Sequence, residues 1–126
     1  MKRGFIGIFL LLLLLFGGLS QIKAAREDLK PIEQTVSLAG QAALAGDWEK
    51  TAALTKKARA AWETHILKFS CLAQQQSVRE ITALYEEVEI FLKAEEGGHC
   101  SAACSMLRNQ LLALLEDQAL ELQNLL

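Results

Sequence analysis

Three cysteines and two histidines carry the clearest reactive potential in this 126-residue chain. Cys100 and Cys104 stand one helical turn apart, and His99 comes directly before them. Two thiolates and an imidazole are ligands that zinc and other soft metals accept. The pattern lacks a fourth local ligand, so His99, Cys100 and Cys104 are weak metal candidates. Buried thiols at a helix crossing, where small residues fit, are the leading interpretation.

Cys71 suggests a second kind of chemistry. In an oxidising compartment, a disulfide between Cys71 and either Cys100 or Cys104 would tie two distant segments together. A bridge between Cys100 and Cys104 within one helix would be strained. The odd number of cysteines leaves one thiol over in either pairing, and the choice between disulfide and free thiols stays open.

The sequence shows no catalytic constellation. A nucleophile beside a base, a paired carboxylate site and a phosphate-binding loop are all missing at recognisable spacing. The Glu86-Glu87-Glu89 run is typical of a solvated helix face, and His65, between Trp62 and Phe69, is typical of a core or boundary histidine. We therefore expect a protein that is not an enzyme and has no cofactor.

The elements that position these residues begin with a membrane-targeting segment. Met1-Lys2-Arg3 precedes an apolar run from Phe5 to Phe16 that continues weakly to Leu19. Residues 4–22 are just long enough to enter a bilayer as an anchor, whereas Gly18-Leu19-Ser20 offers small residues for a signal peptidase. We divide the chain into a signal-anchor or signal peptide at residues 1–23 and an extracytoplasmic helical domain at residues 24–126.

The composition of residues 24–126 indicates an all-α domain. Good helix formers dominate, there is one proline in the chain, and valine occurs at three positions only. Ten Lys and Arg face fifteen Asp and Glu in this part, which gives a formal charge of minus five. A domain with this charge has no electrostatic footprint for nucleic acid, so we expect no nucleic-acid partner.

Helix signals define a first hairpin. Pro31 suits the first turn of a helix, and Gly46 ends that helix. Asp47 is placed as the N-cap of the second helix, which begins at Trp48. The predicted buried face of the first helix is Ile32, Val36, Ala39 and Ala43. The predicted buried face of the second is Trp48, Ala52, Ala58, Trp62, Ile66 and Phe69.

A second hairpin follows. Ser77 and Glu80 form a capping-box pattern that predicts the start of a third helix, and Glu95 to Gly98 predicts its end. The fourth helix is predicted to begin at His99 or Ser101. The predicted apolar face of the third helix is Val78, Ile81, Tyr85, Val88 and Leu92, widened by Leu84 and Phe91. That of the fourth is Cys104, Leu107, Leu111, Leu114 and Leu115, with further leucines up to Leu126.

Together these signals predict an N-terminal hydrophobic anchor helix followed by two antiparallel helical hairpins. The turn regions around Gly46-Asp47-Trp48 and Glu96-Gly97-Gly98 share an outline with tetratricopeptide hairpins. A single hairpin cannot bury its own apolar face, so we expect the two to pack as a four-helix bundle or as a stub of solenoid.

Several segments together resemble a known family. They are the basic start with its apolar run, Gly46-Asp47-Trp48-Glu49-Lys50 leading to Trp62, and the stretch from Ile81 and Leu84 to Phe91-Leu92-Lys93. A closing Leu-Glu-Leu-Gln-Asn-Leu-Leu ends the pattern. The chain resembles, over nearly its whole length, the small membrane-anchored proteins of anaerobic spore-forming Gram-positive bacteria known as domain of unknown function family 4363.

The resemblance implies a retained anchor and a helical domain, and it supplies no activity or site residue. The family pattern has a histidine with following acids before the third helix, where this chain reads Gln74-Gln75-Gln76-Ser77. Any functional role of that corner is therefore not carried over.

We expect a non-enzymatic protein-interaction or structural module, held in the cell membrane by a single span with its bulk outside, or secreted if the leader is cleaved. Its partner would be another membrane or envelope protein, or a second copy of the chain. Binding would use a groove between the hairpins or the leucine-rich stretch with Leu122, Leu125 and Leu126. The alternative is a small-ligand or metal-binding helical bundle.

Overall fold

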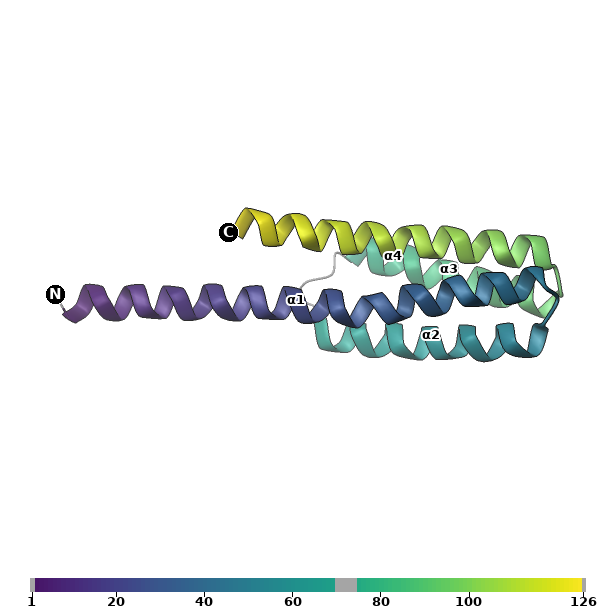
Figure 1. Cartoon of the computed structure of the whole chain (residues 1–126), viewed down its shortest axis with the longest axis horizontal. Coiled ribbons are helices and arrows are strands. Elements are labelled where there is room, and N and C mark those ends of the chain that lie inside the picture. Colours follow the sequence, from purple (N-terminus) through teal and green to yellow (C-terminus); the bar gives the residue numbers. More distant parts are fainter. Residues whose placement is uncertain (1, 70–74, 126) are drawn as a thin grey trace.

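The computed structural model describes residues 2–69 and 75–125, with side chains described for residues 2–68 and 75–117. Four helices follow one another: α1 (Lys2–Leu44), α2 (Trp48–Phe69), α3 (Gln75–Lys93) and α4 (Gly97–Leu125). They run alternately up and down, and the second half of α1 lies beside the other three while its first half projects alone (Figure 1). The predicted all-α fold with an apolar N-terminal helix and a packed bundle is confirmed.

The bundle is closed, because α1 packs against both α2 and α4, and α3 packs against α4 and α2. A solenoid would leave its first and last helices apart. The core contains large side chains from every helix, among them Leu29, Trp62, Tyr85 and Leu107. The predicted face of α1 is buried as expected, as is that of α4 from Cys104 to Leu115, and that of α3 is buried at its centre by Ile81, Tyr85 and Val88. The further leucines predicted on α4 have side chains outside the described set.

The prediction that Pro31 opens a separate helix is wrong, because α1 continues through Pro31 without a break. Proline removes the hydrogen bond to the carbonyl of Glu27, four residues earlier. Both residues are exposed, so water can satisfy that carbonyl. Leu29 and Ile32 on the opposite face are buried in the core and hold the helix together through the proline. The apolar segment and the bundle therefore share one helix.

The predicted buried face of α2 is partly wrong. Ala52 is exposed and Trp48 is half-buried, whereas Ala58 and Trp62 are buried as predicted. The buried face is completed by Thr51, Thr55 and His65. Thr51 can be buried because its hydroxyl donates a hydrogen bond to the Asp47 carbonyl at 2.7 Å.

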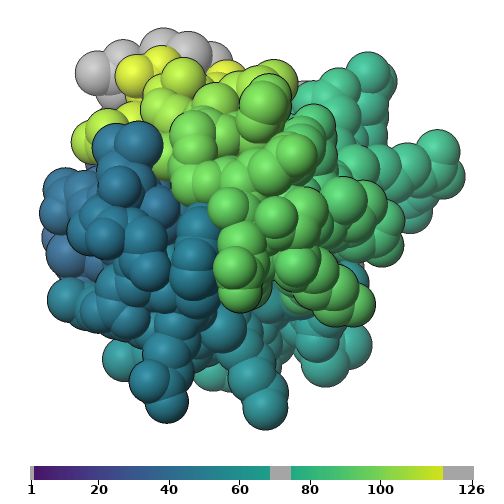
Figure 2. Space-filling model, turned by 90° about the vertical axis from the view of Figure 1, so that its right-hand side faces the viewer, coloured from purple at the N-terminus to yellow at the C-terminus, as the bar shows by residue number. Residues whose placement is uncertain are grey.

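Two tight turns close the far end of the bundle, where both hairpins reverse direction (Figures 1 and 2). In the first, Gly46 adopts φ 75° and the amides of Gly46 and Asp47 bond back to Ala43 and Ala42, which is a Schellman motif. Asp47 then caps α2 as predicted, since its carboxylate accepts the Lys50 amide at 3.2 Å.

The second turn repeats the first with a different residue in the left-handed position. Glu95 adopts φ 54°, and the amides of Glu95 and Glu96 bond back to Leu92 and Phe91. The chain therefore reverses before the glycines, and α4 begins at Gly97 rather than at His99 or Ser101. The capping box at Ser77 is also wrong, because α3 already includes Gln75 and Gln76.

The two turns touch each other through Gly97. A Cβ built on Gly97 would lie 2.7 Å from the Ala43 carbonyl oxygen and 3.6 Å from the Trp48 ring. Real Cβ atoms essentially never come so close to backbone, so glycine is the residue that lets the start of α4 lie against the end of α1.

Candidate functional site between the two hairpins

Cys100 and Cys104 lie inside the bundle on the face of α4 that meets α1 and α3. Both thiols are buried and free, and the Cys100 thiol donates to the Val88 carbonyl at 3.8 Å. Burial raises the pKa of Cys100 and raises the pKa of Cys104 to about 12. A thiol is nucleophilic only as thiolate, so both are poorly reactive at neutral pH.

His99 does not join these thiols. Its ring is exposed, stacks on Phe91 with centroids 5.2 Å apart, and places Nδ1 3.5 Å from a Glu96 carboxylate oxygen. Among residues 2–68 and 75–117, no group of three or more His, Cys, Asp or Glu side chains could hold a metal ion. The three residues proposed as metal ligands are therefore not brought together by the described part of the chain.

Two of the predicted features lie beyond the described side chains. Cys71 falls outside the described residues, so its disulfide with Cys100 or Cys104 stays a prediction. The backbone of α4 reaches Leu125, which includes Leu122, but the side chains there are outside the described set and Leu126 lies outside it entirely. Partner binding by these leucines also stays a prediction.

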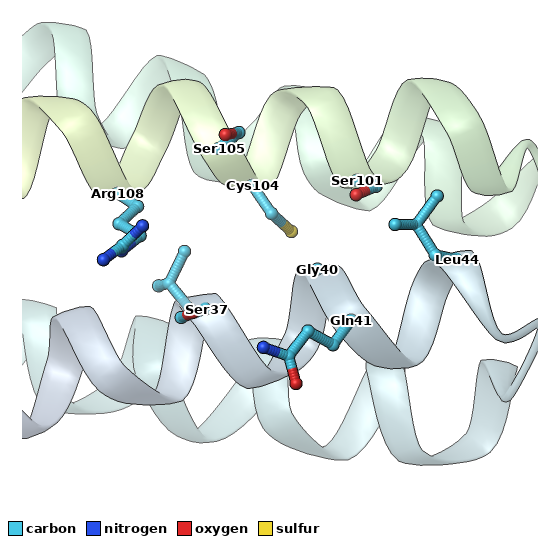
Figure 3. A pocket seen from close by; sticks show the side chains of 9 residues that line it. Ser37, Gly40, Gln41, Leu44, Ser101, Cys104, Ser105 and Arg108 are labelled. Carbon is cyan, nitrogen blue, oxygen red and sulfur yellow. The ribbon is translucent and has the colours of Figure 1, made fainter.

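The structure does place a groove between the hairpins, along the contact of α1 with α4. Its cavity has a volume of about 160 Å³. Figure 3 shows Cys104 pointing from α4 toward Gly40 on α1, with Arg108 reaching down toward Ser37. The residues that line the groove are Val36, Ser37, Gly40, Gln41, Leu44, Ser101, Cys104, Ser105 and Arg108.

Gly40 sets the depth of this groove. A Cβ added there would lie 3.2 Å from the Cys104 Cβ, so the two helices approach closely at this point. Small hydroxyl side chains, Ser37, Ser101 and Ser105, flank the contact and leave room above it. At one end Arg108 forms an ion pair with Glu33 across α1 and α4.

The groove offers polar groups and one apolar contact. Its serine hydroxyls, the Gln41 amide and the Arg108 guanidinium can form hydrogen bonds with a polar partner. Leu44 is 69 % exposed at the other end and offers an apolar contact. The thiol in the groove, Cys104, stays protonated at neutral pH because burial raises its pKa.

A polar pair at the opposite end of the bundle joins a buried histidine to a half-buried carboxylate, and the sequence indicated only the histidine. His65 is fully buried, stacks on Trp62 with centroids 5.6 Å apart, and bonds through Nδ1 to an Asp28 oxygen at 2.8 Å. Burial lowers the pKa of His65, and Asp28 opposes that shift. The sequence placed His65 beside the core, but its partner lies 37 residues away and no local pattern identifies it.

Comparison with known proteins places the chain in a family. Searches of the curated proteins and of the solved structures each found no match. The model of the family described as Domain of unknown function (DUF4363) matches residues 20–125, which cover the whole bundle and most of the chain. The chain therefore belongs to the family Domain of unknown function (DUF4363).

Proposed function

We propose that this chain is a membrane-tethered, non-enzymatic module that binds another protein at the outer face of the membrane through the groove between its hairpins. The observation that carries the proposal is that one continuous helix, α1, has an exposed apolar part and a part packed in the bundle. Its stretch from Phe5 to Phe16 is apolar and exposed, and from Ile22 onward one face of the same helix is buried in the bundle.

The exposed half of α1 supports the tether. Ten large apolar side chains between Phe5 and Phe16 are each more than half exposed, and α1 is the one described helix long and apolar enough to cross a membrane. Moving each such side chain out of water gains about 1.5–3 kcal/mol, which favours burying this segment in a membrane. Lys2 and Arg3 before the segment favour a cytoplasmic start and a bundle on the outer side.

The groove supports the binding role. Its cavity of about 160 Å³ is partly open and has a mixed polar and apolar lining, which suits a side chain or two of a partner segment. Figure 3 shows the side chains that would meet it. The unreactive Cys104 thiol supports binding rather than thiol chemistry in this groove.

Site-specific photocrosslinking in native membranes tests this proposal. A photoreactive residue at Gln41 should give a discrete crosslinked product, and Ser105→Trp, which fills the groove, should abolish it. Lys57→Trp, on an exposed turn of α2, is the matched control and should leave the product unchanged. A product with twice the chain mass would identify self-association. The same product with and without Ser105→Trp would exclude the groove as the binding surface.

A small-ligand bundle is the second candidate, favoured by the cavity of about 160 Å³ in the same groove. Native mass spectrometry of protein purified without chelator tests it directly. A stoichiometric mass excess that Ser105→Trp removes would support a small ligand, and one that Cys100→Ser removes would support a metal. Protein of the bare chain mass would reject both.

A further inference from the structure

Helix α4 is longer than α2 and α3, two of the helices with which it forms the bundle. It has 29 residues, whereas α3 has 19 and α2 has 22. Its last turns continue past the ends of α2 and α3, on the side where the apolar half of α1 projects (Figure 1). The question is what surrounds these turns.

The contacts between α1 and α4 determine which residues of α1 lie level with the last turns of α4. The two helices are antiparallel, so each residue forward on α4 corresponds to about one residue back on α1. Counting from the approach of Cys104 to Gly40 puts Leu122 level with about Ile22. Counting from the contact of Gly97 with Ala43 puts Leu122 level with about Gly18. By the same two counts Leu125 is level with about Leu19 or Leu15, within one turn of the end of the exposed apolar run of α1.

The burial pattern of α1 supports the same register. Leu15, Gly18 and Leu19 are half-buried, although the residues around them are exposed, and they lead at helical spacing into the buried Ile22. A shallow apolar concavity lined by Leu11, Leu14, Leu15 and Gly18 lies along the same part of α1. The register therefore puts the end of the α4 backbone beside this part of α1.

This is also the level at which the membrane surface must lie. The exposed fraction of α1 side chains falls from 74 % at Phe16 to 4 % at Ile22. Residues 4–19 form about 24 Å of helix, which is shorter than the hydrocarbon core of about 30 Å. A short anchor draws the base of the bundle to the headgroups and leaves no aqueous gap beneath it.

We propose that the last turns of α4 lie in the headgroup region of the outer leaflet beside α1, with membrane lipid as their partner and acyl chains in the concavity. The sequence of these turns, Leu120-Glu121-Leu122-Gln123-Asn124-Leu125, mixes leucines with charged and amide residues, as expected at an interface rather than in the hydrocarbon core. The assignment rests on the proposed anchoring by α1. It gives the leucine-rich stretch a lipid role and leaves protein binding to the groove.

Depth-dependent fluorescence quenching tests the placement. The full chain would be reconstituted into vesicles of phosphatidylethanolamine and phosphatidylglycerol, with a small fluorescent residue at Leu12, Leu122 or Arg79. Phospholipids carrying a nitroxide near the headgroup or deep in the acyl chain serve as quenchers. Arg79 is the matched control, because it lies exposed in the first turns of α3 and reports any contact of the rest of the base with lipid.

We expect the deep quencher to act most strongly at Leu12 and the shallow quencher at Leu122, several-fold above its effect at Arg79. Quenching at Leu12 without quenching at Leu122 would overturn this inference and leave the anchor intact. Equal shallow quenching at Leu122 and Arg79 would also overturn it, since the bundle would then lie flat on the membrane. Loss of quenching at Leu12 would instead refute the proposed anchoring. A probe at Leu125 repeats the test if the Leu122 substitution fails to fold.

Discussion

The contact between the two turns predicts that Gly97→Ala destabilises the bundle. The added methyl group would lie 2.7 Å from the Ala43 carbonyl oxygen, which belongs to the backbone and cannot rotate away. The start of α4 must then move off the end of α1, whereas the Trp48 ring, at 3.6 Å, would be in ordinary contact. Gly98→Ala is the matched control, because a Cβ there meets nothing within 4 Å.

The two substitutions should have effects of opposite sign. Overpacking at a close contact costs about 1–3 kcal/mol, whereas replacing glycine by alanine in a helix gains up to about 1 kcal/mol. Gly97→Ala should therefore lower the free energy of unfolding by about 1–2 kcal/mol, and Gly98→Ala should leave it unchanged or raise it by up to about 1 kcal/mol. For a domain of this size, such a loss lowers Tm by about 5–15 °C.

Thermal unfolding of the full chain in detergent micelles measures this difference. Near-ultraviolet circular dichroism and tryptophan fluorescence report the packing around Trp62 and Trp48, which the apolar half of α1 does not affect. Equal Tm values for Gly97→Ala and Gly98→Ala would refute the reasoning, because the turns would then have room for a side chain at both glycines.

Three further predictions follow from the turns, the buried histidine and the thiols. Glu95→Gly should raise Tm, because it relieves a left-handed conformation that costs a non-glycine residue about 1 kcal/mol or more. Gly46→Ala should lower Tm, because it puts a side chain into the same conformation at φ 75°. Burial lowers the pKa of His65 from 6.5, so the unfolded chain binds more protons below that pH. The free energy of unfolding should be fully retained above about pH 6.5 and fall as the pH drops toward the lowered pKa of His65. His65→Gln should flatten this part of the curve of unfolding free energy against pH. An unchanged curve would contradict the prediction. Cys100 and Cys104 should resist maleimide in the folded protein and react after unfolding, as peptide mass spectrometry can show; equal labelling in both states would mean that they are accessible.

The parts of the fold that depend on neighbouring residues could be predicted from the sequence. Asp47 caps α2 through an amide three residues away, and the spacing of Ile32 and Val36 identifies one face of one helix. Both are local properties of the chain. The predicted helix start at Pro31 is wrong, because the local preference of proline for a first turn is overcome by the packing of the core on the other side of α1.

The parts of the site that depend on distant residues could not be predicted. The groove exists because Gly40 and Cys104 approach each other from separate helices. The sequence around either residue does not indicate which residue of the other helix it will contact. The same is true of Glu33 with Arg108 and of Asp28 with His65. Such pairs depend on the register between helices, which the pattern along a single helix does not contain.

The unbroken course of α1 from Lys2 to Leu44 has a mechanical consequence. Under the proposed anchoring, the bundle has no hinge beneath it, so it must follow every tilt and rotation of the membrane segment. A partner that reorients the bundle would exert torque on the span, and a change in bilayer thickness that tilts the span would swing the groove through an arc. Inserting a flexible glycine and serine linker near Gln21 would uncouple these motions while leaving both the span and the bundle in place.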